Sequence, residues 1–268
     1  QTRFYACFAI AIAAVMAIAY AENLFTLFIF YEVLSLCTYP LVTHAGTEKA
    51  KKGGRVYLGI LMGTSIAFFL PAIIITWLVA GTLDFQQGGI FPEQTPIALL
   101  SLLLVLFVFG VAKAAVMPFH RWLPAAMVAP TPVSALLHAV AVVKAGVFSL
   151  IKILVFIFGL DTLQQIPVSD YLLYLAGAGV VLASLIAMRQ DNLKARLAYS
   201  TISQLGYITV GVLLAVESGV MGSAMHIATH ALGKITLFFC AGAILVASHK
   251  SEISSMVGLG RSMPITMT

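Results

Sequence analysis

Apolar runs of about twenty residues recur along the whole chain, and this feature limits its fold most severely. A helix of ~20 residues crosses the ~30 Å hydrocarbon core of a bilayer and satisfies its backbone hydrogen bonds internally. Of 268 residues, 61% are hydrophobic and only 9% are charged, whereas roughly 25% are charged in soluble domains. We therefore expect an all-α, polytopic membrane protein whose spans cover about 4–20, 24–44, 56–80, 97–118, 131–158, 171–188, 197–216 and 220–247.

Basic residues are confined to alternate connections between these expected spans. Six acidic residues and no lysine or arginine occur in the connections 21–23, 81–96, 159–170 and 217–219. Eleven lysines and arginines occur in the other set, which is 1–3, 45–55, 119–130, 189–196 and 248–263. Basic loops stay in the cytoplasm. We expect a bacterial inner (plasma) membrane location with 45–55, 189–196 and 248–263 on the cytoplasmic side.

No motif for a cofactor accompanies the spans. The three cysteines, Cys7, Cys37 and Cys240, lie inside apolar runs without the spacing of metal or iron–sulfur ligands. No glycine-rich nucleotide loop follows a strand pattern. We expect the chain itself to bind no cofactor, metal or nucleic acid, and whether it belongs to an enzyme stays open.

Five ionisable residues remain inside the expected spans: Glu32, Lys113, Lys144, Lys152 and Lys234. A charge at the bilayer centre costs at least ~2.5–3.5 kcal/mol, so each group needs an explanation. Lys152 is near a span end, where its stem could reach the interface. The others lie deeper, where an unpaired lysine can exchange protons near neutral pH. They indicate a proton path, with a buried ion pair that merely joins helices as the alternative.

The stretch "HIATHALGK" places His226, His230 and Lys234 four residues apart. Residues at this spacing share one face of a helix. This ladder of three ionisable side chains, His226, His230 and Lys234, predicts a proton relay. Histidines four residues apart can also bind zinc, but no carboxylate accompanies them in that span. His138 and Lys144 are six residues apart, so we infer only that they share the span 131–158.

Prolines at 118, 124, 130 and 132 follow Lys113 closely. Proline breaks helices, and broken helices at membrane depth are tolerated where they line a cavity or are buried in protein. We expect such a break about five residues after Lys113, with the lysine facing the cavity.

An internal repeat accompanies this pattern. The stretches "YEVLSLCTYPLV" (31–42) and "YSTISQLGYITV" (199–210) share four residues in register at an offset of 168. The same offset superposes three spans on three later ones, and five spans separate the copies, so the copies have opposite orientation. We expect a first five-helix unit at 1–160 and a truncated, inverted second unit at 170–268, as in an excerpt of a longer polypeptide.

Three stretches resemble a known family: "KAAVMPFHRWLPAAMVAPTPVSALLHAVAVVKAGVF" (113–148), "DNLKARLAYSTISQLGYI" (191–208) and "HIATHALGKITLFF" (226–239). They are similar to the antiporter-like subunits shared by Mrp-type multisubunit cation/proton antiporters, respiratory complex I and membrane-bound hydrogenases, with the D-type Mrp subunit closest. The resemblance implies a fold of about fourteen helices, truncated here at both ends.

The resemblance also implies a function and a site. Glu32 matches the glutamate of the family's fifth helix, Lys113 the lysine paired with it, and Lys144 the lysine of the eighth helix. With His138 and the ladder His226, His230 and Lys234, these residues form the expected proton-translocation site. The implied function is proton translocation, with sodium or potassium as candidate exchanged ions, beside other membrane subunits. A redox-driven pump subunit and a non-transporting scaffold are the alternatives.

Overall fold

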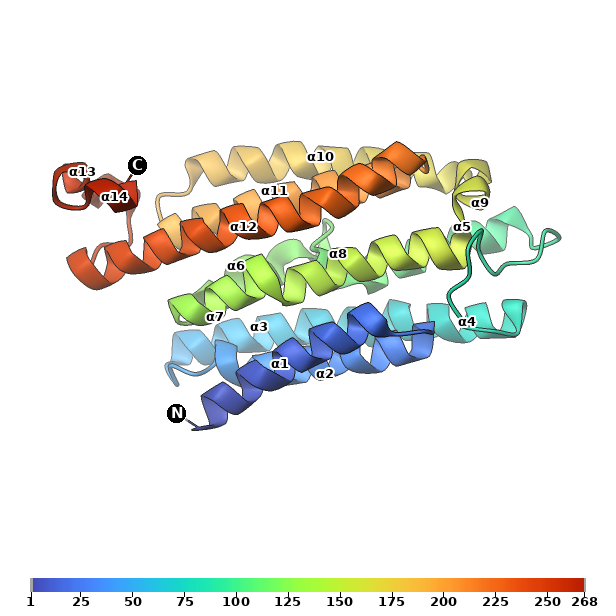
Figure 1. Cartoon of the computed structure of the whole chain (residues 1–268), viewed down its shortest axis with the longest axis horizontal. Coiled ribbons are helices and arrows are strands. Elements are labelled where there is room, and N and C mark those ends of the chain that lie inside the picture. Colours follow the sequence, from blue (N-terminus) through green and yellow to red (C-terminus); the bar gives the residue numbers. More distant parts are fainter. Residues whose placement is uncertain (1, 268) are drawn as a thin grey trace.

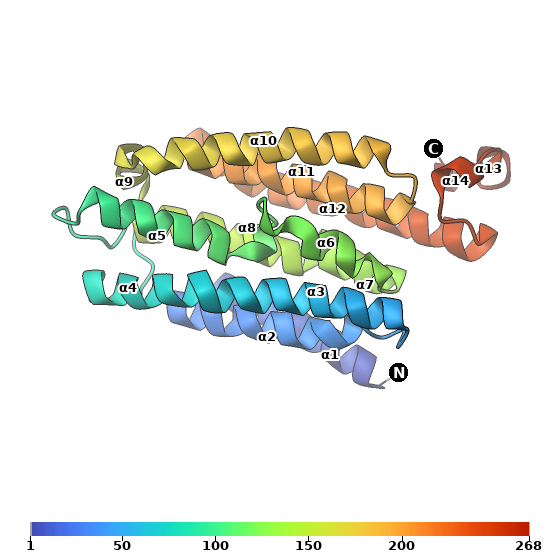
Figure 2. The same ribbon diagram turned by 180° about the vertical axis from the view of Figure 1, so that it is seen from behind.

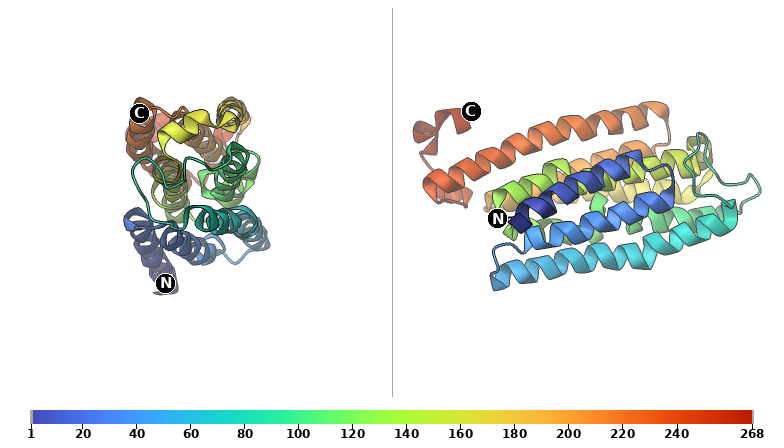
Figure 3. Two further views of the ribbon diagram at one scale, coloured as in Figure 1. Left: turned by 90° about the vertical axis from the view of Figure 1, so that its right-hand side faces the viewer. Right: turned by 60° about the horizontal axis from the view of Figure 1, so that its bottom comes forward.

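The computed structural model describes residues 2–267, most of which lie in helices. The long helices run side by side in one elongated bundle (Figure 1). The helices of residues 2–80 form one side of the bundle, those of 167–248 the opposite side, and the segment between them fills the middle (Figure 3). The helices are α1 (Thr2–Tyr20), α2 (Leu24–Val42), α3 (Glu48–Thr64), α4 (Leu70–Ala80), α5 (Ile97–Gly110), α6 (Trp122–Ala125), α7 (Thr131–Ala135), α8 (Val142–Ile153), α9 (Leu160–Gln165), α10 (Pro167–Arg189), α11 (Leu193–Leu213), α12 (Glu217–Ser248), α13 (Leu259–Ser262) and α14 (Pro264–Met267).

Shorter turns connect or extend several of these helices. π-helical turns cover Ser65–Phe69, Leu136–Val140 and Leu154–Phe158. Turns of 3-10 type cover Ala112–Ala114, Phe119–Arg121, Ala126–Val128 and Ile253–Ser255.

Six helical segments among the described residues are long and apolar enough to cross a membrane. They are α1, α2, α10, α12 and two composite helices, Glu48–Ala80 and Thr131–Phe158. The expected span 97–118 is split, because α5 ends at Gly110. The expected span 197–216 corresponds to α11, which is a full-length helix but carries basic and hydroxyl-bearing residues. The all-α, polytopic membrane fold is confirmed.

Large apolar side chains cover the outside of the bundle as well as its core. Leu78, Tyr171, Met188, Leu232 and Val246 are all exposed. The surface helices of a soluble bundle would carry polar residues at such positions. An outer surface of this kind is suited to lipid tails.

The connections gather at the two ends of the bundle (Figure 1). Connections 43–47, 190–192 and 249–258 lie at the end that also holds the first residues of α1. Connections 81–96 and 159–166 lie at the opposite end. The basic and the acid-rich connections therefore face away from each other, as the alternation of spans predicts.

A short backbone pairing joins the segments before α2 and after α4. Asn23 pairs with Asp84, and Leu24 N donates a hydrogen bond to Leu83 O at 2.9 Å. The Asn23 side chain accepts a hydrogen bond from Thr26 N at 2.8 Å. The asparagine thus caps α2 and satisfies a backbone donor that a helix start leaves free.

The same arrangement recurs before α11 and after α12. Asn192 pairs with Glu252, and Leu193 N donates to Ser251 O at 3.0 Å. The Asn192 side chain accepts from Ala195 N at 3.1 Å. Each of these residues follows its counterpart in the first junction by 168 or 169 positions. The recurrence supports the division into units 1–160 and 170–268, which stays a prediction.

The second junction carries an extra carboxylate contact. The Ser254 hydroxyl donates to Asp191 Oδ2 at 2.6 Å, and Ser254 N donates to Asp191 Oδ1 at 2.9 Å. The hydrogen bond from the Ser254 side chain, and then that from its backbone, hold the pKa of the exposed Asp191 carboxyl below its ordinary value.

Candidate ion-translocation site

The helix that approaches Lys113 breaks inside the bundle, which confirms the predicted broken helix. Figure 2 shows the irregular segment about halfway along the bundle, between α5 and α6. The predicted position of the break is wrong, however. Helix α5 already ends at Gly110, Lys113 lies within the following 3-10 turn, and Ala115 has a φ of 54°. Lys113 is therefore part of the break rather than five residues before it.

Two buried aromatic side chains stabilise this early break. The Tyr31 hydroxyl accepts a hydrogen bond from Lys113 N at 3.0 Å, and Trp122 Nε1 donates to Ala112 O at 2.9 Å. Both rings are fully buried. Irregular backbone at membrane depth is stable only where protein groups replace its missing hydrogen bonds. Tyr31 and Trp122 supply those bonds before the prolines are reached.

The Lys113 ammonium is held by fixed, neutral acceptors. Lys113 is 0% exposed. Its Nζ donates to Tyr31 O at 2.7 Å and to the Ser35 hydroxyl at 2.7 Å. The same atom lies 3.1 Å from the centroid of the Tyr31 ring, so a cation–π contact adds to the hydrogen bonds.

Glu32 and Lys113 form no salt bridge in the described structure, although the Glu32 charge acts on Lys113 through space, so their pairing stays a prediction. Among residues 2–267 the one salt bridge joins Lys51 to Glu48, at 2.8 Å. Glu32 follows Tyr31 in α2 and is therefore rotated by ~100° around the helix from the residue that Lys113 contacts. Both Glu32 carboxylate oxygens are buried without a hydrogen-bond partner in the described structure. Buried polar groups without a protein partner are normally hydrogen-bonded to ordered water.

The other lysine of the middle segment contacts a titratable group directly. Lys144 of α8 and His230 of α12 form a hydrogen bond between Nζ and Nδ1, in which the donor depends on where the proton lies. The rings of His230 and His226 stack, with centroids 5.9 Å apart and planes at 15°. His226 Nε2 in turn donates to the Gln204 side-chain oxygen of α11 at 2.8 Å. Lys144, His230, His226 and Gln204 thus form a chain of contacts across three helices.

The predicted ladder keeps its single face because α12 is continuous from Glu217 to Ser248. Lys234 is nevertheless not hydrogen-bonded to the histidines. It is 4% exposed, and its Nζ donates to Leu197 O of α11 at 3.3 Å. The ladder therefore has two parts: a stacked histidine pair in contact with Lys144, and a lysine held by a backbone carbonyl.

His138 lies beside the same helix. Its ring centroid is 5.3 Å from that of Phe238, which is one turn beyond Lys234 on the same face of α12. The π-helical turn Leu136–Val140 carries His138, so the spacing of a regular helix did not reveal this position. Both ring nitrogens of His138 are buried without a hydrogen-bond partner in residues 2–267.

A glycine brings the Lys113 turn next to α8. A Cβ added to Gly146 would overlap the carbonyl carbon of Lys113 and the nitrogen of Ala114. Gly146 follows Lys144 by two residues, so the backbones that carry the two lysines are in van der Waals contact. The lysine side chains then diverge, one toward α2 and the other toward α12.

Lys152, which lies near a span end, contacts backbone carbonyls rather than a titratable side chain. Its Nζ donates to Ala19 O at 3.2 Å and to Ala21 O at 2.5 Å. It therefore binds carbonyl groups at the C-terminal end of α1, where a cation is favourable. The Phe85 ring centroid lies 4.5 Å from the same nitrogen.

Sequence reasoning missed the hydrogen-bonding partners of the site, which are Tyr31, Ser35 and Gln204. All three are polar residues inside expected spans, and this was the available signal.

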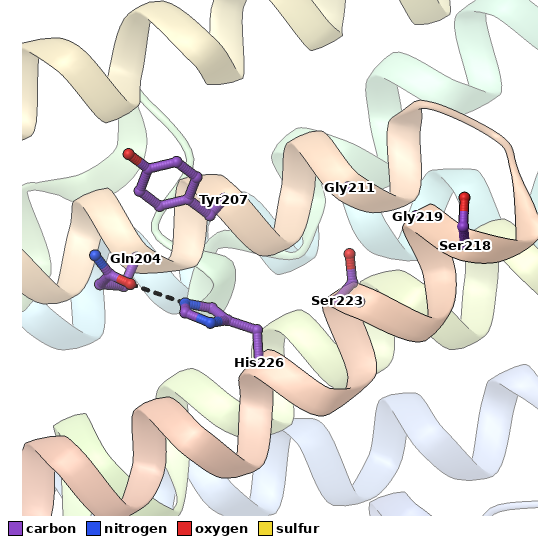
Figure 4. Close-up of a pocket in the computed structure, with 8 residues that line it drawn as sticks. Gln204, Tyr207, Gly211, Ser218, Gly219, Ser223 and His226 are labelled. Carbon is purple, nitrogen blue, oxygen red and sulfur yellow. Dashed lines mark hydrogen bonds between the residues drawn. The ribbon is translucent and has the colours of Figure 1, made fainter.

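No group of three or more His, Cys, Asp or Glu side chains placed to hold a metal ion occurs in the described part of the chain. A groove of about 550 Å³ between α11 and α12 ends at His226 (Figure 4).

Comparison with known proteins gives consistent matches. The family model described as "NADH:quinone oxidoreductase/Mrp antiporter, TM" matches residues 21–268. NADH-quinone oxidoreductase subunit N of Desulforudis audaxviator (strain MP104C) is 32% identical over 275 residues, which cover 100% of this chain and 53% of that protein. A probable K(+)/H(+) antiporter subunit of Rhizobium meliloti (strain 1021) is 35% identical over 272 residues, with coverages of 99% and 26%.

A solved structure agrees with these sequence matches. A chain in the structure of the Mrp complex from Dietzia sp. DQ12-45-1b superposes with a TM-score of 0.83 at 30% identity, over 92% of this chain and 27% of that chain. The chain spans about half, or less, of the length of the relatives it matches. Because the family model covers nearly all of it, the chain belongs to the NADH:quinone oxidoreductase/Mrp antiporter transmembrane family.

Proposed function

We propose that this chain forms part of a proton-translocating membrane subunit within a multisubunit complex. The contact between Lys144 and His230 carries the proposal. A lysine ammonium can only donate a hydrogen bond, so a charged Lys144 requires an unprotonated His230 Nδ1. With the proton on His230, the neutral amine becomes the acceptor instead. Because two like charges in contact disfavour each other, the pair shares a single extra proton.

The neighbouring residues extend this pair into a path. His226 stacks on His230 and bonds to Gln204, so we assign it the next transfer step. Lys113 adjoins Lys144 through the Gly146 contact and would feed the pair. Glu32, whose buried carboxylate lacks a partner, would set the charge near Lys113. We assign His138 and Lys234 to a side branch of the path, because neither is hydrogen-bonded to the histidine pair. The His138 ring packs against Phe238 of α12, and Lys234 donates to Leu197 O of α11.

Two alternatives remain for the transported ion and for the reaction that drives transport. Similarity to a probable K(+)/H(+) antiporter subunit favours cation/proton antiport, with potassium or sodium as the exchanged ion. Similarity to an NADH-quinone oxidoreductase subunit favours a proton pump driven by redox chemistry in partner subunits. The path through Lys144 and His230 serves either. Our assignment to the D-type Mrp subunit stays a prediction.

The basic connections indicate how the chain is oriented in the membrane. We place 45–55, 189–196 and 248–263 in the cytoplasm of a bacterium, with the chain in the inner membrane beside other membrane subunits. The positive-inside rule supports this orientation.

Proton flux into lipid vesicles tests the proposal against a scaffold that transports nothing. The native complex would be reconstituted with the wild-type chain, with Lys113→Ala or with Lys152→Ala, and a pH-sensitive dye would follow flux. We expect Lys113→Ala to reduce flux strongly. Lys152→Ala should have little effect, because Lys152 binds helix-end carbonyls. Equal flux in all three assembled complexes would favour the scaffold.

A further inference from the structure

We propose that the basic end of the bundle holds a binding site for an anionic phospholipid, between α12, the start of α11 and the segment that leads into α7. The lipid phosphate would lie beside Lys194 and Lys250, and one acyl chain would lie in an apolar groove along α12. The inference goes beyond the proposed function and does not depend on it, because lipid binding requires no proton transfer.

Two lysines line a small hollow at this end of the bundle. The hollow has a volume of about 180 Å³ and is formed by the start of α11, the last turns of α12 and the residues that follow α12. Lys194 is the second residue of α11, and Lys250 lies two positions after the last residue of α12. Both side chains are half-buried. The lysines therefore lie at helix ends, which is the level of the lipid head groups.

No carboxylate pairs with these two lysines in the described part of the chain. No aspartate or glutamate lines the hollow, and neither lysine takes part in a salt bridge. The adjacent Glu252 accepts hydrogen bonds from Asn192 Nδ2 at 2.9 Å and from the Ser251 hydroxyl at 3.2 Å. Neutral donors thus hold this carboxylate, and both lysines are left to bind another anion.

Both ammonium groups also have free donors. Lys194 Nζ donates one hydrogen bond, to Ala129 O at 3.1 Å, and a lysine ammonium has three N–H groups. Lys250 Nζ has no hydrogen-bond partner within residues 2–267. A single lysine would reach solvent along its stem, whereas two lysines around one hollow bring several donors to the same place. A phosphate group, which is rich in acceptor oxygens, fits this set of donors.

An apolar groove of about 640 Å³ adjoins the hollow and shares Lys194 and Leu245 with it. Lys194 is the one charged residue of its lining, and apart from this lysine and Thr131 the walls are apolar. They include Phe239, Leu245 and Val246 of α12 and, on the facing segment, Val128, Pro130 and Pro132. A cation at one end of an apolar groove matches the chemistry of a phospholipid, in which a charged head group is joined to apolar chains.

The groove leads inward from the head-group level. Leu245, Gly242 and Phe239 follow each other at intervals of three residues, so they share one face of α12 and span ~9 Å. Phe239 and Val246 are 57% and 77% exposed, so the groove opens on the outer surface of the bundle. Figure 1 shows this part of α12 beside α7 at the end of the bundle. An acyl chain can therefore enter the groove sideways from the bilayer.

Charge distinguishes an anionic lipid from the other occupants. Bound water needs several polar partners, and a divalent metal ion needs carboxylate or carbonyl oxygens, whereas these walls are mostly apolar. A zwitterionic lipid would fill the groove but would gain little from the lysines. A lysine near the head groups favours an anionic lipid by roughly fivefold, so two lysines give the site its selectivity.

Photo-cross-linking of the full-length chain in its native complex tests the site. The complex would be placed in phosphatidylcholine nanodiscs that contain a small fraction of phosphatidylglycerol with a photoreactive acyl chain. A phosphatidylcholine probe with the same chain is the comparison. Mass spectrometry of the digested chain would locate and quantify the cross-links. We expect the phosphatidylglycerol probe to label residues 239–246 severalfold more than the phosphatidylcholine probe does.

Variants of the lysines test the head-group contact. Lys194→Gln and Lys250→Gln should each lower labelling by the phosphatidylglycerol probe roughly fivefold and leave labelling by the phosphatidylcholine probe unchanged. Lys52→Gln is the matched control, because Lys52 is an exposed lysine of α3 at the same end of the bundle and lines neither the hollow nor the groove. If Lys194→Gln fails to assemble, Lys250→Gln decides, since the Lys250 side chain supports no contact within the described chain.

Three results would overturn the proposal. Equal labelling of 239–246 by the two probes would indicate bulk lipid on an apolar surface. Absence of labelling by both probes would indicate that a protein segment covers the groove. An equal decrease in Lys52→Gln would indicate a general effect of surface charge rather than a site. Because cross-linking does not involve transport, unchanged proton flux in Lys113→Ala would defeat the proposed function and leave the lipid site standing.

Discussion

Lys113 and Lys144 are neighbours through the Gly146 contact, yet the molecule holds them in different ways. Lys113 donates to a backbone carbonyl and a serine hydroxyl, neither of which can take its proton near neutral pH. Lys144 contacts a histidine, which can. Burial alone therefore does not make a relay residue, because the partner decides whether a proton can leave. Lys113 is thus held by neutral acceptors, whereas Lys144 has a partner with which it can exchange a proton.

The backbone around Lys113 also differs from the backbone that carries the histidines facing Lys144. Around Lys113 the helix is broken, and Tyr31 and Trp122 take over its hydrogen bonds. The facing helix α12 is unbroken over 32 residues, so its histidines stay in register and stack. Irregular backbone positions a single charge, whereas a regular helix positions a series of side chains.

The largest expected effect is the loss of transport on Lys144→Ala. Removal of the group that shares a proton with His230 should lower proton flux by on the order of a hundredfold, the usual contribution of a placed acid or base. Lys152→Ala, on the same helix, should change flux less than about twofold. Comparable losses in both variants would mean that the partner of the lysine does not matter, which would contradict the comparison.

Gly146→Ala should destabilise the contact between the two lysine-bearing segments. The new Cβ would overlap Lys113 backbone atoms, and overpacking of this kind costs ~1–3 kcal/mol. Thermal unfolding of the purified complex measures the effect. Gly177→Ala on α10, where a Cβ meets nothing within 4 Å, should stay within ~0.5 kcal/mol of wild type. A neutral Gly146→Ala would disprove the close approach.

Ser35→Ala should have a smaller effect on transport. Lys113 loses one neutral acceptor but keeps Tyr31 O and the Tyr31 ring, so we expect a decrease in flux of a few fold, measured in the same vesicles. Tyr31→Phe is the companion variant, since it removes the acceptor for Lys113 N and keeps the ring. A loss as large as that of Lys144→Ala would show that the Lys113 site also depends on a single partner.

The smallest effect concerns the two junctions. The hydrogen bonds from Ser254 depress the pKa of Asp191, so their stabilisation is present above the carboxyl's ordinary pKa and is lost as pH falls through the lower folded value. Protection of the Ser254 amide against hydrogen exchange should therefore decrease in acid. Asp191→Asn should remove this pH dependence.

The first junction is the internal control for that measurement. Leu24 N bonds to a backbone carbonyl there, so its protection should change little with pH. A parallel loss of protection at both junctions would indicate general unfolding in acid rather than titration of Asp191.

The sequence predicted features that depend on neighbours along the chain. The lengths of the apolar runs predicted the spans, and the prolines predicted a broken helix. The four-residue spacing predicted that His226 and His230 share one face. The position of the break was not predictable, because Tyr31, 82 residues away from Lys113, satisfies the freed backbone. His138 was displaced by a π-helical turn that leaves no clear signal in the sequence.

Contacts between spans were the main gap. Lys144 and His230 are 86 residues apart, and no spacing rule relates them. A direct salt bridge between Glu32 and Lys113 was one way to satisfy the lysine, because buried charges of opposite sign favour contact. A carbonyl, a hydroxyl and an aromatic ring meet the ammonium instead, and composition could not distinguish the two solutions.

The most direct test of the shared proton between Lys144 and His230 is a flux cycle with Lys144→Ala, His230→Ala and the double variant, in vesicles that contain equal amounts of assembled complex. Two groups that act in series on one path couple strongly, so the double variant should transport no more slowly than the slower single variant. Multiplication of the two losses in the double variant would show independent roles and contradict the relay.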